Sequence, residues 1–88
     1  MAQIALEDLT ADTWVAFSDI ETPVSDQLYF IQNRGNGVFI AQESAAEPTD
    51  DAGVIVEPYK VLKYIAGTDT LYLKALYGEC TINITSEG

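Results

Sequence analysis

Hydrophobic and polar residues alternate along most of this chain with a period close to two, which predicts β-strands rather than helices. The segments QLYFIQN and VFIAQE are separated by residues 34–37, RGNG, whose glycines and asparagine suit a tight turn. We therefore expect a β-hairpin here. The register that we favour pairs Ile31 with Ile40, which keeps apolar residues together; a turn placed one residue later would pair Ile31 with Gln42.

A second hairpin is predicted by the segment LYLKALYGECTINIT near the end of the chain. Its turn is expected at residues 78–79, with glycine first. This register places Leu73 opposite Ile84 and Ala75 opposite Ile82. One face of the hairpin is then apolar and the other polar, so we expect it to cover a core and to expose its back to water.

Short runs of aromatic and β-branched residues predict three further strands, over Thr13–Asp19, Val54–Val56 and Tyr59–Ile65. Pro58 prevents one unbroken central strand, so the last two are either two short strands or one bent edge strand; a helical turn over Lys60–Ile65 is the alternative. The alanines, acids and Pro48 of Ser44–Gly53 predict a loop.

Six to seven short strands without a long helix indicate an all-β fold, a small antiparallel sandwich or barrel. A chain of 88 residues is too short to divide into two cores, so we expect one domain over residues 1–88. A core of this size leaves a thin margin of stability, which oligomerisation would increase.

The first predicted hairpin is apolar on both faces, and one small core can cover only one of them. We expect the core to take one face, formed by Tyr29, Ile31, Val38 and Ile40. The other face would form a patch that contacts another protein chain. The predicted interface residues are Leu28, Phe30 and Phe39.

The formal net charge of −10 at pH 7 makes nucleic acids and anionic membranes poor partners. No apolar run approaches the length that spans a bilayer, and the first ten residues do not resemble a secretion signal. We expect a protein that is made in a cytoplasm and that binds neither nucleic acid nor membrane.

The chain offers few groups for catalysis. It has no histidine, and Cys80, the only cysteine, points into the core in the predicted register. Acid pairs such as Asp50-Asp51 lie in a loop and lack the spacing of a calcium site. We expect no enzymatic activity, no catalytic or metal-binding residues and no cofactor.

The order of several short segments resembles a group of small proteins encoded among phage structural genes. Its elements are Gln32-Asn33 at a strand end, a Gly-rich turn, Ile40-Ala41, an Ala-Ala-x-Pro loop at residues 45–48, Gly53 and the closing hairpin. The likeness covers about Tyr29 to Thr85, although Tyr59 stands where that group has a glycine.

The resemblance implies a virion structural protein, such as a capsid decoration or head/tail surface protein. Its partners would be other virion proteins and copies of itself, and it would be located in the virion after synthesis in the host cytoplasm. The alternative is a β-sandwich module that binds a carbohydrate or a receptor, because aromatic side chains can form a sugar-stacking surface.

Overall fold

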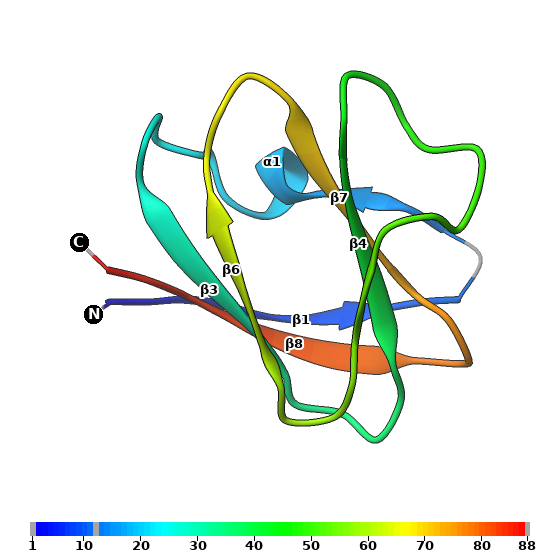
Figure 1. Ribbon diagram of the computed structural model, residues 1–88. Helices are drawn as coiled ribbons and strands as arrows, with labels where there is room; N and C mark the ends of the chain where they lie inside the picture. The colour runs from blue at the N-terminus through cyan, green and yellow to red at the C-terminus, as the bar shows by residue number, and fades with distance from the viewer. Residues whose placement is uncertain (1, 12, 88) are drawn as a thin grey trace.

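The computed structural model describes residues 2–11 and 13–87 as a sandwich of two antiparallel sheets (Figure 1). This arrangement confirms the predicted all-β class, and the sheets do not close into a barrel. The described residues form eight short strands, one or two more than expected. The elements are β1 (Ala2–Leu9), β2 (Val15–Ala16), α1 (Phe17–Ile20), β3 (Leu28–Asn33), β4 (Phe39–Ser44), β5 (Val54–Val56), β6 (Val61–Ile65), β7 (Thr70–Ala75) and β8 (Cys80–Ser86).

Sheet A has the strand order β1-β8-β3-β6 and sheet B the order β2-β7-β4-β5. The two orders correspond position by position: β1 with β2, β8 with β7, β3 with β4, and β6 with β5. The two strands of each of these pairs follow one another in the chain, so the chain passes to the matching position in the opposite sheet after β1, β3, β5 and β7. The connections β3–β4, β5–β6 and β7–β8 are arches, each of which joins a strand of one sheet to a strand of the other (Figure 1).

The predicted hairpin over residues 28–42 is therefore wrong, because β3 and β4 belong to different sheets. Ile31 pairs with Ile84 of β8, whereas Ile40 pairs with Lys74 of β7. Packed sheets lie about 10 Å apart and paired strands only about 4.8 Å apart, so the five-residue connection spans a wider gap than a hairpin turn does.

The predicted hairpin near the C-terminus is wrong for the same reason. Leu73 pairs with Ala41, and Ile84 pairs with Ile31 in the other sheet. The burial pattern was nevertheless predicted correctly, since Leu73 and Ile84 are both fully buried in the core. An arch and a hairpin both require alternating apolar residues, and only the pairing partner differs.

Asn33 supplies the local reason why β3 ends in an arch. Its side chain is fully buried, and its Nδ2 donates hydrogen bonds to the carbonyl oxygens of Gly37 (2.9 Å) and Val56 (3.0 Å). Its Oδ1 accepts bonds from the Gly35 amide (3.0 Å) and the Cys80 thiol (3.2 Å). One amide thereby stabilises the turn after β3 and joins it to strands of both sheets. Cys80 is buried, as predicted.

The core lies between the sheets and is centred on three aromatic rings. Phe17 contacts Tyr29 and Tyr64 edge to face, with ring centroids 4.9 Å and 5.2 Å apart. The Tyr29 hydroxyl remains satisfied by accepting a hydrogen bond from the Val24 amide, 2.9 Å away. Aromatic pairs packed in this way stabilise the fold by more than the burial of their apolar area alone.

The core assignment made for the first predicted hairpin is correct only for β3. Tyr29 and Ile31 point into the core. Phe39, predicted at an interface, is also fully buried in the core, while Ile40 is buried outside that cluster and Val38 precedes β4. Because β4 belongs to the opposite sheet, its core-facing residues are Phe39 and Ala41 instead of the predicted Val38 and Ile40.

Three other predictions changed in detail. The expected strand Thr13–Asp19 is reduced to β2 and followed by α1, which turns Phe17 into the core. The strand expected over Tyr59–Ile65 begins at Val61, and the helical alternative is wrong. Sequence reasoning had assigned no strand to β1.

No helix in residues 2–11 and 13–87 has the length and apolar character needed to cross a membrane.

Candidate functional site

The two outer faces of the sandwich differ, and this difference locates the candidate site. On sheet B, Ile40 lies on the outer face beside its ladder neighbours Ile55 and Lys74, yet it is only 1% exposed. The connection between β4 and β5 extends over this face, since Asp51 forms an ion pair with Lys74. The loop predicted over residues 44–53 thus covers part of sheet B.

Two details fix the loop and the lysine that it contacts. Gly53 has a φ of +141°, and a Cβ there would lie 2.4 Å from the carbonyl oxygen of Ala41, so the backbone passes tightly against β4. Lys74 also places its ammonium 4.8 Å from the centroid of the Trp14 ring, which is a cation–π contact. The chain's own loop therefore covers the part of sheet B around Ile40 and Lys74, while Ile55 on the edge strand stays 59% exposed.

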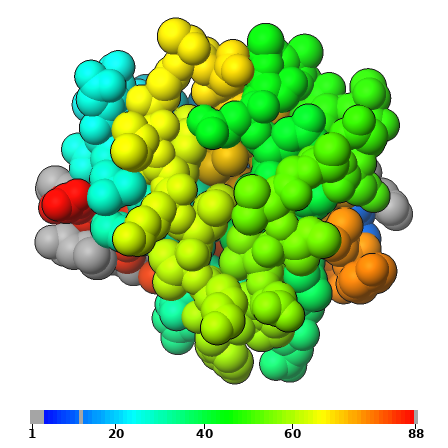
Figure 2. Space-filling view, viewed as in Figure 1, coloured from blue at the N-terminus to red at the C-terminus, as the bar shows by residue number. Residues whose placement is uncertain are grey.

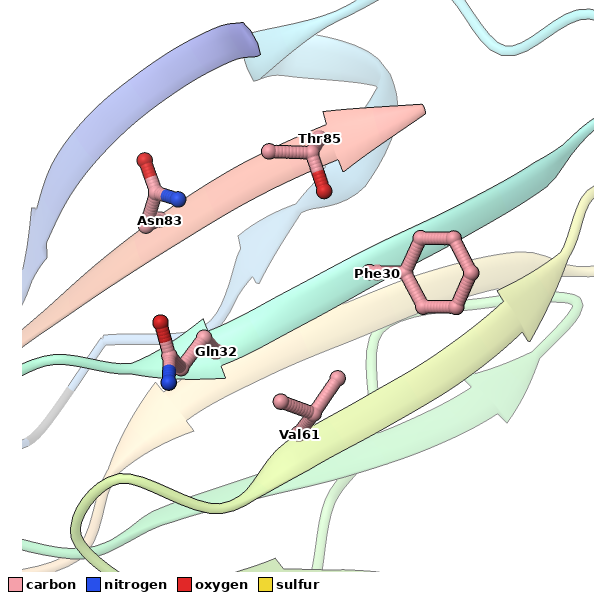
Figure 3. Close-up of a pocket in the computed structure, with 5 residues that line it drawn as sticks. All are labelled: Phe30, Gln32, Val61, Asn83 and Thr85. Carbon is pink, nitrogen blue, oxygen red and sulfur yellow. The ribbon is translucent and has the colours of Figure 1, made fainter. Parts of the chain in front are cut away.

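The outer face of sheet A has no such cover in the described chain. A groove of about 330 Å³ lies on it between β8, β3 and β6. Figure 3 shows the lining side chains rising from these three neighbouring strands: Phe30, Gln32, Val61, Asn83 and Thr85. The strand register brings these side chains together, because Phe30 pairs with Thr85 and Gln32 pairs with both Asn83 and Val61.

The groove combines apolar surface with neutral hydrogen-bonding groups. Phe30 and Val61 supply the apolar part, and two amides and a hydroxyl supply the polar part. The Gln32 amide donates a bond of 3.4 Å to the Tyr59 carbonyl. None of the five lining side chains titrates near neutral pH. This chemistry suits binding by contact and hydrogen bonding.

Of the predicted interface residues, the structure brings Leu28 and Phe30 together on the outer face of β3, both half-buried. Phe39 is separated from them by the core, where it is fully buried. Sequence reasoning missed the other apolar residues of this face. These are Leu6 at 65%, Val61 at 49% and Ile65 at 61% exposure.

Two smaller hollows lie beside Tyr64 of β6, one between β6 and β4 and the other between α1 and the start of β7. One, of about 90 Å³, includes Glu43, Lys63 and Tyr64, and the other, of about 200 Å³, includes Tyr64 and Asp69. Figure 2 shows this side, with the 45–56 segment in green beside the yellow β6. Burial raises the pKa of Tyr64, and the nearby Glu43 carboxylate raises it further.

The other titratable group with a shifted pKa is Cys80, whose burial raises the pKa of its thiol. A raised pKa disfavours the thiolate, which is the reactive form. Within residues 2–11 and 13–87, no three His, Cys, Asp or Glu side chains gather in a way that could hold a metal ion.

The aromatic side chains do not form one stacking surface. Tyr29, Phe39 and Tyr64 are in the core, while Tyr59 and Tyr77 are 63% and 76% exposed in separate turns. Phe30 is the one aromatic residue that lines the sheet A groove. Comparison of the chain with protein-family models, with curated proteins and with solved structures finds no match.

Proposed function

We propose that this protein is a phage virion structural protein, a capsid decoration or head/tail surface protein, that acts by binding other protein chains through the outer face of sheet A. The observation that carries the proposal is the contrast between the two outer faces. The β4–β5 loop extends over sheet B, where Ile40 is only 1% exposed, although Ile55 on the edge strand stays 59% exposed. Sheet A has no such loop in the described chain and leaves three apolar residues, Leu6, Val61 and Ile65, about half exposed or more.

The composition of the sheet A face supports a protein partner. Exposed aliphatic side chains and Phe30 lie beside neutral amides, and protein–protein interfaces combine apolar with neutral polar side chains in this way. A contiguous apolar patch left in water also favours association. The net charge of −10 opposes binding to nucleic acid or to an anionic membrane.

The virion setting comes from the sequence resemblance over about Tyr29 to Thr85. Such a protein is made in the host cytoplasm and then joins the particle. It needs a stable surface rather than a catalytic centre, and the groove lining, with no group that titrates near neutral pH, is consistent with such a role.

The first test is to purify particles of a phage that encodes this chain and to identify their proteins by mass spectrometry. The chain should be present at a fixed stoichiometry relative to a capsid or tail protein. Its absence from washed, intact particles would refute a virion role.

A second test concerns the face itself. Phe30→Ser should weaken binding to particles by roughly ten-fold or more, because it removes the aromatic side chain that lines the groove. Tyr77→Ser is the matched control, since Tyr77 is exposed in the β7–β8 connection, outside the strands of this face. Equal binding by both variants would show that the sheet A face is not the interface.

A carbohydrate- or receptor-binding module is the second candidate, favoured by the amides and hydroxyl beside Phe30 in the groove. Sugars are bound by hydrogen bonds of this kind together with an aromatic contact. A glycan array tests it: a specific signal that Gln32→Ala abolishes would favour this function, and an array without signal would oppose it.

A further inference from the structure

We infer that the partner of sheet A is a second copy of this chain, placed head to tail so that β1 of one copy pairs with β6 of the next. The inference rests on the proposed function, since it names the partner of the same sheet. β1 and β6 are the two ends of sheet A, and each pairs with one neighbouring strand in the described chain. A strand in this position is a template for pairing with another chain.

The strand directions permit this arrangement. Each neighbouring pair in the sheet is antiparallel: β1 with β8, β8 with β3, and β3 with β6. Because the sheet has an even number of strands, β1 and β6 run in opposite directions. A copy displaced along the sheet therefore presents its β1 antiparallel to β6 of the first copy, and the ladder continues without a change of type.

The residues at the two ends of one ladder row are both apolar and exposed. Leu6 pairs with Asn83, Asn83 with Gln32, and Gln32 with Val61. Leu6 is 65% and Val61 49% exposed. When the next copy continues the row without a shift, Val61 lies beside Leu6 of that copy, and both lose contact with water.

The adjacent row ends in opposite charges. Glu7 pairs with Ile82, and Ile82 pairs with Asn33. Just before β6, the Asn33 backbone amide donates to the Lys60 carbonyl at 3.0 Å, and the Asn33 carbonyl accepts from the Tyr59 amide at 2.8 Å. Tyr59 and Lys60 thus both lie opposite Asn33 at the far end of this row. Both charged residues are exposed. The same unshifted register that joins Leu6 to Val61 therefore brings Glu7 opposite Lys60, and such cross-strand pairs stabilise a ladder.

The symmetric alternatives bring like charges together. Pairing β1 with itself places the acids Glu7 and Asp8 near their copies, and residues 1–33 contain no lysine or arginine. Pairing β6 with itself brings Lys60 and Lys63 near their copies, and residues 58–68 contain no acid. Like charges on neighbouring strands are destabilising, so the charge pattern selects the mixed pairing.

A head-to-tail contact repeats from copy to copy. It forms a closed ring if the rotation between copies closes, and a filament if it does not. The twist between neighbouring strands supplies a rotation at each step. The outer faces of sheet A then join into one surface that carries the Phe30 groove once per copy, which is an arrangement suited to binding a repetitive particle surface.

Charge exchange tests the inference on the full chain. Glu7→Lys and Lys60→Glu are each followed by sedimentation velocity from about 1 μM to 1 mM. Each variant alone should associate about ten-fold or more weakly than the wild type, because it sets like charges at the contact. An equal mixture of the two should regain association, and so should a single chain that carries both exchanges.

Glu47→Lys is the control matched to Glu7→Lys, since this exposed acid lies in the loop between β4 and β5 and its replacement makes the same change in net charge. It should leave association unchanged. Regained association in the mixture also shows that both variants are folded. The inference is overturned if the wild type stays monomeric at 1 mM, or if Glu7→Lys and Lys60→Glu associate as the control does. A monomer that is nevertheless found in purified particles would refute head-to-tail pairing and leave the proposed virion role intact.

Discussion

The side-chain amide of Asn33 donates a 3.0 Å hydrogen bond to the carbonyl oxygen of Val56 and so joins the end of a sheet A strand to the edge strand of sheet B. The same side chain bonds to Gly35 and Gly37 in the turn that follows. A buried amide with all these partners is favourable, whereas each partner left alone is costly. Asn33 therefore stabilises the crossing between the two sheets.

Replacing Asn33 by Ala should lower the free energy of unfolding by about 2–4 kcal/mol, because the buried Gly37 and Val56 carbonyls each lose a donor. Urea denaturation of the full chain measures this change. Asn36→Ala is the control, since Asn36 is exposed in the same turn and its loss should change stability by no more than about 0.5 kcal/mol. Similar values for the two variants would contradict the role given to Asn33.

Stability should fall on the alkaline side. Burial raises the pKa of Cys80, so the native state keeps its proton when the unfolded chain, with a thiol pKa of about 8.5, begins to lose it. The stabilisation is complete below that pH and is lost as the pH rises through the native pKa. The Tyr64 pKa is raised as well, which adds a second decline above about pH 10.

Urea denaturation between pH 7 and 10.5 tests this linkage. Each group contributes a slope of at most about 1.4 kcal/mol per pH unit. Cys80→Ala should remove the decline that begins near pH 8.5 and keep the later one. If the two chains lose stability in parallel over the whole range, the thiol is not the cause.

The sequence predicted which residues of the chain are buried better than it predicted their pairing. Alternation correctly identified Tyr29, Ile31, Leu73 and Ile84 as core residues, because a strand in a sandwich is half-buried whichever strand it pairs with. It could not distinguish a hairpin from an arch, since the short connections 34–38 and 76–79 contain glycines that suit either.

The consequences of that ambiguity fall on the candidate site. In a hairpin, β3 and β4 share two faces, so Leu28, Phe30 and Phe39 were grouped together. In the arch, β3 and β4 lie in different sheets, so the residues that face the core are set separately for each strand. Phe39 then faces the core. One local signal for the arch was present. Asn33 stands at the end of an apolar strand, four residues before Gly37, and its side chain donates a hydrogen bond to the Gly37 carbonyl. The Leu6–Val61 row required the sheet order, which depends on contacts between distant parts of the chain.

Gly53 should not tolerate a side chain. Its φ of +141° is unfavourable for other residues, and an alanine Cβ would lie 2.4 Å from the backbone oxygen of Ala41. Gly53→Ala should therefore lower the unfolding free energy by about 1–3 kcal/mol. Gly67→Ala is a matched control, because an added Cβ there meets nothing within 4 Å, and it should be neutral or slightly stabilising. Thermal unfolding that ranks the two variants in the opposite order would contradict this geometry.

The last prediction concerns Lys74, which connects the loop over sheet B to the sheet. Its ammonium pairs with Asp51 and lies 4.8 Å from the Trp14 ring centroid, and its side chain is only 14% exposed. Lys74→Ala removes the ion pair, the cation–π contact and the packing of the alkyl stem, whereas Asp51→Asn removes only the ion pair, whose acid is 60% exposed. Exposed ion pairs contribute little, so Asp51→Asn should lower the unfolding free energy by less than about 1 kcal/mol and Lys74→Ala by about 1–2 kcal/mol.

Trp14 is the only tryptophan, so its fluorescence reports on this contact directly. The emission should change in Lys74→Ala, where the ring loses its cover, and stay close to that of the wild type in Asp51→Asn. Limited proteolysis provides a second measurement. Cleavage within residues 45–53 should be faster in Lys74→Ala, because this change removes the donor, whereas the side-chain oxygen kept in Asp51→Asn can still accept a hydrogen bond from Lys74. If the two variants are cleaved at the same rate and show the same emission, then the ion pair rather than the lysine stem holds the loop, and the cover of sheet B depends on Asp51.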